Sequence, residues 1–387
     1  MTRICLILGL VISIFAIHPS ANAYPQFIGY KYSSCLTCHY NGNGNGPLND
    51  YGRALWSAEI AGKLFNGKTS DEKLAESSGF LGSTKLPWWI RPGIKARQLY
   101  YISDMSSDNE SSDSITMQAE ANVAIFFDRD QKYAFVGSIG YVPEPLRASA
   151  NTEFDTMITR EHYIRLQTTE ALWLYIGKTD KVYGIRHVNH TAYSRAFVGL
   201  AQNDQTHGVI AHYVKPEWEW SVHAFAGNMS QDSDRRQVGA STMYEYELKP
   251  AWRLGVSALN STNDYVANQR FAVHSRYGFG YGSAILFELG NIKNTPERGA
   301  GTNGYYIYSE AMQKMVRGYH VFVSGQAYKE DMVAEEADNF KLAVGMLIFP
   351  MARTEFRFDL ENVRSVNPGA VVDNDSWNFM LQAHISL

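Results

Sequence analysis

Apolar and polar residues alternate with a period of two from Trp88 to Leu387, in runs of about 10 to 14 residues. Successive side chains of a β-strand point to opposite faces, so each run predicts a strand with one apolar and one polar face. In the second run, Ile115, Met117, Ala119, Ala121, Val123 and Ile125 share one face, and Thr116, Gln118, Glu120 and Asn122 share the other. The final run sets Trp377, Phe379, Leu381, Ala383, Ile385 and Leu387 opposite Asn378, Met380, Gln382, His384 and Ser386.

The chain contains about 16 such runs, and the connections between them alternate in length. Short connections fall near 129–131, 168–170, 215–217, 248–250, 280–281, 316–318 and 350–353, and longer polar ones, such as 104–113, 178–205, 295–302 and 366–374, lie between them. Outer-membrane barrels have an even number of antiparallel strands, short periplasmic turns and long external loops. Residues 88–387 are therefore predicted to form an all-β, transmembrane antiparallel β-barrel of about 16 strands in the bacterial outer membrane.

A soluble β-sandwich is the alternative for these runs, and the polar faces help to distinguish the two folds. A sandwich has shorter strands, and its outer faces are polar. Here one face of run after run is apolar, and the other carries charges such as Arg357, Asp359 and Glu361. In a wide barrel the apolar face meets lipid and the charged face lines the lumen, which favours the barrel.

The first 23 residues have the pattern of a secretory signal peptide. Arg3 gives the positive start, Ile4 to Ile17 form an apolar stretch of 14 residues, and Ala21-Asn22-Ala23 is a small-residue cleavage site. The stretch is short for a membrane-spanning helix, which argues against an uncleaved anchor. The mature chain is expected to begin at Tyr24.

Five residues near the expected mature N-terminus, Cys35-Leu36-Thr37-Cys38-His39, match C-x-x-C-H, the attachment motif of a c-type haem. The two thiols add to the haem vinyl groups, and the adjacent histidine ligates the iron. The spacing suits this chemistry because one helical turn places both sulfurs on one porphyrin edge. A disulfide and a thioredoxin-like redox pair are the alternatives, and the redox pair requires a βαβ context that this sequence lacks.

The composition agrees with a secreted barrel and argues against nucleic acid as a partner. The chain has three cysteines, of which Cys5 lies in the predicted signal peptide. It has 24 Tyr, 19 Phe, 8 Trp and 31 Gly, and no later run of 18 apolar residues, which is typical of a transmembrane β-barrel. The formal net charge is −4, which gives no basic footprint for nucleic acid.

Residues 24–66 are predicted to form a small, helical monohaem cytochrome c segment, and residues 67–87 a polar, Gly/Ser-rich linker to the barrel. Within the segment, the alternating Asn and Gly residues from Asn41 to Gly46 predict a turn. Asn49 is predicted to cap a short helix that follows this turn.

Three stretches at the front of the chain carry a resemblance to a known family: Pro25-Gln26-Phe27, Cys35-Leu36-Thr37-Cys38-His39 and Pro47-Leu48-Asn49-Asp50-Tyr51-Gly52-Arg53. Together with the predicted barrel, they resemble the fused monohaem cytochrome c–porins of the outer membrane of iron-oxidising bacteria. The resemblance implies one haem c, attached at Cys35 and Cys38, with His39 as an axial ligand of the iron. It also implies electron transfer between periplasmic c-type cytochromes, or other soluble carriers, and an extracellular donor or acceptor such as Fe(II). The chain is then an electron carrier more than a catalyst, with Fe(II) oxidation as the reaction implied.

The predicted cytochrome segment lacks a second axial ligand of the usual kind, because residues 24–87 contain no Met and no His except His39. The iron is then five-coordinate, takes an uncommon ligand such as Lys, Tyr or Asn, or takes a ligand from the barrel. Strand parity gives the inward-facing candidates: His320, Met380 and His384 near the periplasmic rim, His212 near the inner end of its strand, and His223 and His274 at mid-barrel. Each of these histidines is more simply explained as a lumen histidine bonded to water or to a carboxylate.

The third external loop, 178–205, is expected to fold into the lumen, as this loop often does in 16-stranded porins. It contains Arg186-His187-Val188-Asn189-His190, and His207 follows soon after. The His-x-x-His pair could hold a metal ion near the haem. Two histidines alone are a weak metal signal, however, and packing of the loop through Arg186 and Arg195 is the simpler expectation.

Three functions from different classes follow from these features. The main prediction is an electron conduit, in which a haem at or in the barrel passes electrons across the outer membrane. The alternative is a solute-conducting porin in which the haem-bearing segment is a plug or sensor, and an open-channel conductance would distinguish it from a sealed conduit. An enzyme that reduces peroxide or binds small gases at a five-coordinate haem is the third, and it needs a distal acid–base group that no local segment provides.

Overall fold

The computed structural model of the chain describes residues 25–44, 46–65, 67–83, 86–105, 110–141, 157–334, 338–367 and 374–386. The predicted signal peptide, residues 1–23, and the expected mature N-terminus at Tyr24 lie outside the described residues. No helix among the described residues is both long and apolar enough to cross a bilayer.

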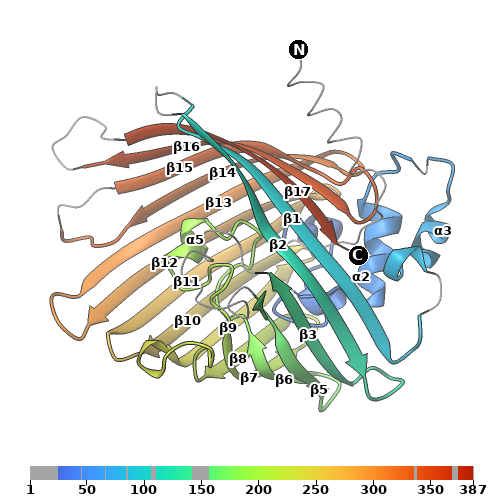
Figure 1. The fold of residues 1–387 in the computed structure, drawn as a ribbon, viewed down its shortest axis with the longest axis horizontal. Coiled ribbons are helices and arrows are strands. Elements are labelled where there is room, and N and C mark those ends of the chain that lie inside the picture. The colour runs from blue at the N-terminus through green and yellow to red at the C-terminus, as the bar shows by residue number, and fades with distance from the viewer. Residues whose placement is uncertain are drawn as a thin grey trace.

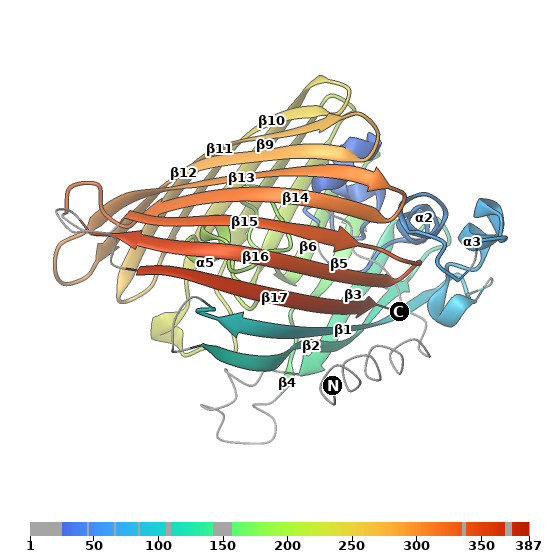
Figure 2. The same ribbon diagram turned by 90° about the horizontal axis from the view of Figure 1, so that it is seen from above.

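The described residues form one closed antiparallel sheet, shown in Figures 1 and 2. Its strands are β1 (Ile90–Ser103), β2 (Ser111–Phe126), β3 (Tyr133–Tyr141), β4 (Met157–Ile158), β5 (His162–Gln167), β6 (Leu172–Thr179), β7 (Thr206–Val214), β8 (Trp218–Phe225), β9 (Val238–Lys249), β10 (Trp252–Thr262), β11 (Val266–Phe279), β12 (Ser283–Pro296), β13 (Thr302–Val316), β14 (Tyr319–Lys329), β15 (Asp338–Ile348), β16 (Thr354–Val366) and β17 (Asn374–Ser386). Strand β1 pairs with β2 and also with β17, which closes the barrel. Since β4 and β5 both pair with β3, the 17 strands occupy 16 positions in the wall, as predicted.

Strands β4 and β5 follow each other on the same partner strand, and a bulge separates them. Gly140 pairs with Ile158, whereas Gly137 pairs with His162, so one extra residue stands on the β4–β5 side. Arg160 lies in this bulge and bonds Glu120 across the lumen face at 2.9 Å. The bulge therefore turns a charged side chain toward the interior.

The alternation of the strands separates a lipid-facing surface from a polar lumen. On β10, Leu254 and Val256 are 41% and 45% exposed, whereas Arg253 and Ser257 are 1% and 2% exposed. A soluble sandwich would show the opposite pattern, with the aliphatic face buried. The apolar faces point outward and the charged faces point inward, which confirms the barrel prediction.

The chain before the barrel is built of short helices, which lie at the barrel end that holds the C-terminus (Figure 2). They are η1 (Pro25–Tyr30), η2 (Cys35–Thr37), α2 (Asp50–Leu55), η3 (Trp56–Ile60), α3 (Asp71–Glu76) and η4 (Phe80–Gly82). We call residues 25–65 the N-terminal segment. The side chain of Asn49 accepts a hydrogen bond from the Gly52 amide at 2.8 Å, so the predicted cap of α2 is confirmed.

The N-terminal segment is packed against the inner wall of the barrel. The Trp56 ring lies 4.4 Å from the Phe349 ring, centroid to centroid, and the Gly62 amide donates to the Phe349 carbonyl at 2.7 Å. At Gly29 the backbone passes so close to the backbone of Ser283 on β12 that a Cβ there would overlap it. These contacts join the segment and the wall in one apolar core.

The predicted linker, residues 67–87, contains helix α3 and is attached to the barrel rim. Arg317, in the turn between β13 and β14, donates to Asp71 at 2.7 Å and to the Ala61 carbonyl at 2.6 Å. Arg353, in the turn between β15 and β16, donates to the carbonyls of Ser77 and Gly79. Two rim arginines therefore hold this stretch in place.

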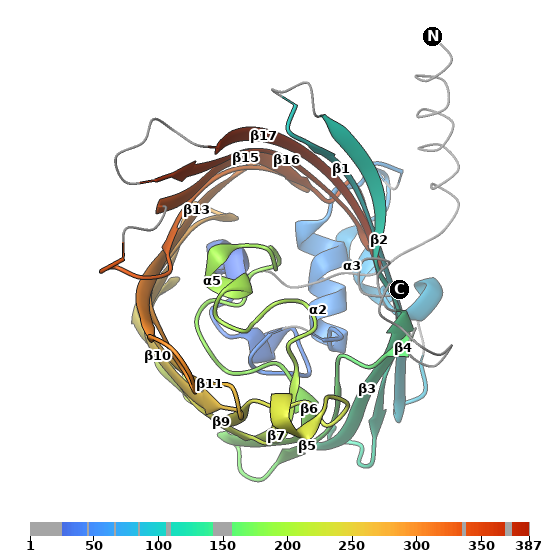
Figure 3. The same ribbon diagram turned by 60° about the vertical axis from the view of Figure 1, so that its left-hand side comes forward.

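The connection between β6 and β7 folds into the lumen, as predicted for the third external loop. We call residues 180–205 the lumen loop. Figure 3 looks into the barrel and shows its short helix α5 (Tyr193–Ala196) surrounded by the strands, together with the N-terminal elements. The only other helix of the described barrel residues is η6 (Ser233–Arg235).

Candidate functional site

The Cys35–His39 motif forms one tight turn. The amides of Cys38 and His39 donate to the Cys35 carbonyl at 3.2 and 3.0 Å. Asn49 fixes the turn from outside, because its side chain donates to the Thr37 carbonyl at 3.0 Å and its amide donates to the Cys38 carbonyl at 2.9 Å. The same asparagine that caps α2 thus sets the conformation that presents both thiols and the imidazole.

The two thiols are free, and their environment is unlike that of a redox pair. No disulfide joins Cys35 and Cys38. Burial raises the pKa of Cys35 to about 11 and that of Cys38 to about 12, so both remain protonated at neutral pH. A thioredoxin-like pair has a lowered thiol pKa, so this geometry disfavours that alternative.

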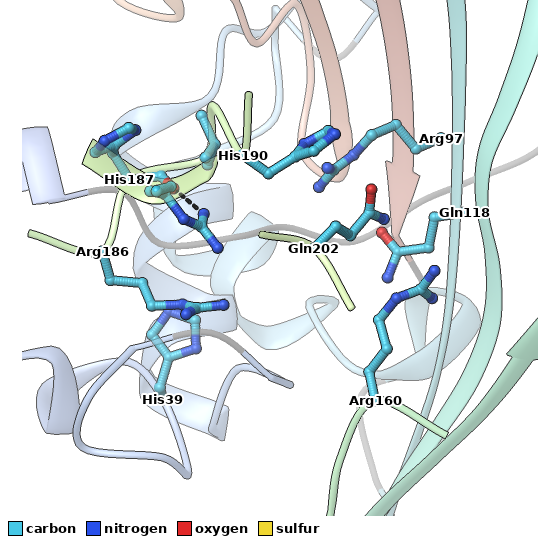
Figure 4. Close-up of a pocket in the computed structure, with 10 residues that line it drawn as sticks. His39, Arg97, Gln118, Arg160, Arg186, His187, His190 and Gln202 are labelled. Atoms are coloured by element: carbon cyan, nitrogen blue, oxygen red, sulfur yellow. Dashed lines mark hydrogen bonds between the residues drawn. The ribbon is translucent and has the colours of Figure 1, made fainter. Parts of the chain in front are cut away.

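His39 faces a cavity of about 80 Å³ that opens to solvent, and the space not filled by atoms here, open solvent included, is about 610 Å³. The side chain is 1% exposed. Figure 4 shows the wall opposite His39, to which the barrel and the lumen loop both contribute. The lining residues are His39, Arg97, Gln118, Arg160, Arg186, His187, Val188, His190, Arg195 and Gln202.

The cavity lies at about half the height of the barrel. Arg97 is the eighth of the 14 residues of β1, and it pairs with Gln118 on β2. Both side chains line the cavity, so their position along the strands marks its depth. His39 therefore faces the middle of the lumen, whereas Cys35 lies near Arg253 and Arg276, toward the barrel end that holds the C-terminus.

Four arginines give the cavity an excess of positive charge. Arg160 is paired with Glu120 at 2.9 Å, and Arg186 is paired with Asp180. Among the described residues, buried nitrogens of Arg97 (Nε), Arg160 (Nη2) and Arg186 (Nη1) have no hydrogen-bond partner. Such unsatisfied cationic donors favour an anionic group at this place.

The surroundings of His190, on the lumen loop, keep its imidazole neutral in this cavity. Burial and, to a smaller extent, the nearby Arg97, Arg195 and Arg160 together lower the pKa of His190 to about 3. A neutral imidazole has a nitrogen lone pair and can serve as a metal ligand.

The three barrel residues predicted as weak candidates for the second ligand lie elsewhere. His320 is 3.2 Å from the Tyr30 hydroxyl and His384 is 3.2 Å from Glu355. Met380 lines a neighbouring cavity that it shares with His190. None of the three belongs to the described lining of the His39 cavity, so the structure does not bring them to the motif.

The other histidines named from the sequence are lumen residues, as expected. His212 bonds Glu219 at 3.1 Å, and His274 bonds Glu245 at 3.0 Å. His223 is buried in the lumen wall, and His207 lies 3.2 Å from His162 on the β5 side. Among the described residues, no group of three His, Cys, Asp or Glu side chains is arranged to hold a metal ion.

Sequence reasoning named His187, His190, Arg186 and Arg195 but missed Arg97 and Arg160. Arg97 carries a signal that could have been used, because it is a charged residue on the inward face of the first strand. Arg160 carries none, since the bulge that turns it inward depends on pairing with β3. Only the closed barrel brings these residues to the same cavity as His39.

Known proteins resemble this chain in fold. No family model and no curated protein matches the sequence. Among solved structures, the loop-deleted OmpT outer-membrane protein of Vibrio cholerae matches with a TM-score of 0.60 and 12% identity, over 77% of this chain and 99% of that one. The anion-selective porin of Comamonas acidovorans matches with a TM-score of 0.58 and 8% identity, over 77% and 99%. The outer-membrane channel DcaP of Acinetobacter baumannii matches with a TM-score of 0.55 and 10% identity, over 80% and 99%.

These likenesses show a porin-type outer-membrane barrel and nothing finer. Residues 88–387 make up about 78% of the chain, which equals the matched share in size. The fold thus implies a lipid environment and the bacterial outer membrane.

Proposed function

We propose that this protein carries electrons across the outer membrane on one covalently bound haem c. Cys35 and Cys38 would form the thioethers, and His39 would be an axial ligand of the iron. One observation carries the proposal: the attachment motif lies inside the barrel, and its His39 faces a cavity at mid-height of the lumen. A segment that only anchors the protein or binds a soluble partner would not need to bring this motif there.

The donor set of the cavity fits a haem. The turn of Cys35–His39 holds two free thiols next to an imidazole that lines the cavity. The unpartnered nitrogens of Arg160 and Arg186 suit the two propionates of the porphyrin, since guanidinium groups bind carboxylates through charge-assisted hydrogen bonds. When bound, the haem would supply a one-electron carrier.

The position also suits the distances of electron transfer. The apolar band of an outer-membrane barrel is about 25 Å tall, so a carrier held inside the barrel would shorten the distance that an electron has to cross. The strands of the wall separate this carrier from lipid on all sides. Electrons would enter or leave through periplasmic c-type cytochromes on one side and an extracellular donor or acceptor, such as Fe(II), on the other.

A solute-conducting porin with a haem-bearing plug is the second candidate. The similarity to an anion-selective porin and the four arginines of the cavity favour an anion pathway in the lumen. However, the N-terminal segment and the lumen loop both occupy the lumen. We therefore rank the conduit first, and conductance in a planar bilayer decides between them, since a sealed conduit gives none of the large open-channel current of a porin.

Haem reduction in intact cells tests the proposal directly. The haem Soret and α bands would be followed anaerobically after addition of Fe(II) or of a larger dye that cannot cross the outer membrane. Rapid reduction that disappears in Cys35→Ala cells is the expected result, with barrel assembly checked by heat-modifiable migration. If reduction occurs only after the membrane is broken, the haem is a periplasmic appendage and the porin function becomes the better account.

A further inference from the structure

The lumen loop is attached to the wall on both sides of its histidines. Before them, the amides of Gly184 and Ile185 donate to Ser257 at 3.0 Å and to Glu288 at 2.5 Å. After them, the amide of Tyr193 donates to Gln326 at 2.9 Å. Residues 186–192 therefore form a short span between fixed ends, and this span faces the His39 cavity.

The two histidines of this span differ in how firmly they are held. His187 stacks on Tyr308 at 4.1 Å with an interplanar angle of 4°, and its Nε2 lies 2.9 Å from the Ser194 hydroxyl. His190 is the central residue of a turn in which the Asn189 side chain accepts a hydrogen bond from the Thr191 amide at 3.1 Å. No described residue forms a hydrogen bond with the His190 ring, which lines both the His39 cavity and the adjoining one.

We propose that His190 is the second axial ligand of the haem iron, an inference that rests on the proposed function. The N-terminal segment has no Met and no second His to offer. His320 and His384 are each held by another residue outside this cavity, and His187 is fixed against Tyr308. His190 combines a place in the cavity with an imidazole that has no competing hydrogen-bond partner among the described residues.

This assignment gives the lumen loop a specific task. The attachment motif provides one face of the haem site from the N-terminal segment, and the loop provides the other face from the connection between β6 and β7. The arginines on the same loop, Arg186 and Arg195, then lie around a bis-imidazole iron. Axial ligation by two imidazoles favours a lower reduction potential than ligation by His and Met.

The spin state of the iron tests the inference in the haem-loaded protein. Optical and electron paramagnetic resonance spectra would be recorded for the wild type and for His190→Ala, His190→Met and His384→Ala. We expect a low-spin wild type, a high-spin His190→Ala protein that returns to low spin with added imidazole, and a low-spin His190→Met protein with a higher reduction potential. His384→Ala is the matched control, a buried lumen histidine bonded to Glu355, and its spectrum should not change.

Each other outcome has a defined meaning. A high-spin wild type, or a His190→Ala protein that stays low-spin, overturns the inference, and loss of the low-spin form only in His187→Ala would move the ligand to that residue. These results leave the proposed function standing as long as mass spectrometry finds covalent haem. A wild type without covalent haem overturns the proposed function itself.

Discussion

Two parts of the chain enter the lumen of this barrel, and they differ in how they are held. The N-terminal segment lies against the wall through an apolar core, with Trp56 on Phe349 and the backbone of Gly29 on that of Ser283. The lumen loop also packs on the wall through apolar residues such as Tyr193, and in addition the wall side chains of Ser257 and Gln326 accept hydrogen bonds from its backbone amides. The two meet at the cavity that His39 lines.

Under the proposed function, the difference suits a cofactor site inside a pore. Apolar packing fixes the position of the part that would carry a covalent group, because close-packed cores tolerate little displacement. In the loop, packing and amide hydrogen bonds fix Ile185 and Tyr193, and no described residue forms a hydrogen bond with the ring of His190 between them. The N-terminal segment would then hold the covalent group, and the loop would supply a side chain to its other face.

Removal of the His39 imidazole is expected to have the largest effect on the two-part site. In His39→Ala, the iron would lose the ligand supplied by the N-terminal segment, and we expect nearly complete loss of the low-spin spectrum. The thioethers at Cys35 and Cys38 should still retain the haem, and the barrel should still assemble. Optical spectra and mass spectrometry of the purified protein check this, and an unchanged spectrum would exclude His39 as a ligand.

A smaller effect is expected when the apolar packing of the N-terminal segment against the barrel wall is disturbed. In Gly29→Val, the new side chain overlaps the Ser283 backbone, and overpacking of this kind costs about 1–3 kcal/mol. The N-terminal segment should then become more sensitive to protease, whereas the strands should not. Gly325→Ala is the matched control, because a Cβ there has open space, and equal protease sensitivity of the two variants would contradict the docking described here.

The smallest expected effect comes from the charge pair at the rim. Burial tends to raise the pKa of Asp50, but hydrogen bonds from Arg91 and Arg53 lower it below its ordinary value of 3.8. Because the folded pKa is the lower one, the pair stabilises docking above pH 3.8 and loses this effect as the pH falls through the folded value. Since half of the Asp50 side chain is exposed, we expect less than about 1 kcal/mol.

Protease sensitivity of the N-terminal segment as a function of pH measures this effect. Cleavage should increase as the pH falls below about 4, and Asp50→Asn should remove the part of the pH dependence that comes from this pair. Asp375→Asn is the control, because Asp375 pairs with Arg364 where both side chains are exposed. Identical pH profiles for the two variants would show that Asp50 does not contribute to docking.

Most of the barrel could be predicted from the sequence because strand periodicity is a local property. Each run such as Phe340–Ile348 shows its apolar and polar faces within itself, and the alternation of short and long connections gives the direction of each strand. The break between β4 and β5 could not be found this way. It is a bulge set by pairing with β3, and the residues that cause it look like an ordinary continuation of the run.

The candidate site also has one part that local sequence patterns predict and another part that they do not. The attachment motif and the cap at Asn49 are local patterns, and both could be recognised. Which residues face His39 is decided by barrel closure, which brings β1, β2 and the lumen loop together across long sequence separations. For this reason the rim candidates His320, His384 and Met380 were reasonable from strand parity but do not lie at the motif.

The burial of Cys35–His39 inside a closed wall also constrains the order of biogenesis. The motif precedes β1 in the chain, and the wall closes only when β17, the last strand, pairs with β1. Under the proposed function, an enzyme that attaches haem would have to reach the thiols while they are still accessible, so attachment would come before closure. Maturation in the periplasm and insertion into the membrane would then be consecutive steps on one polypeptide, and a cell short of haem would assemble barrels that cannot be repaired afterwards.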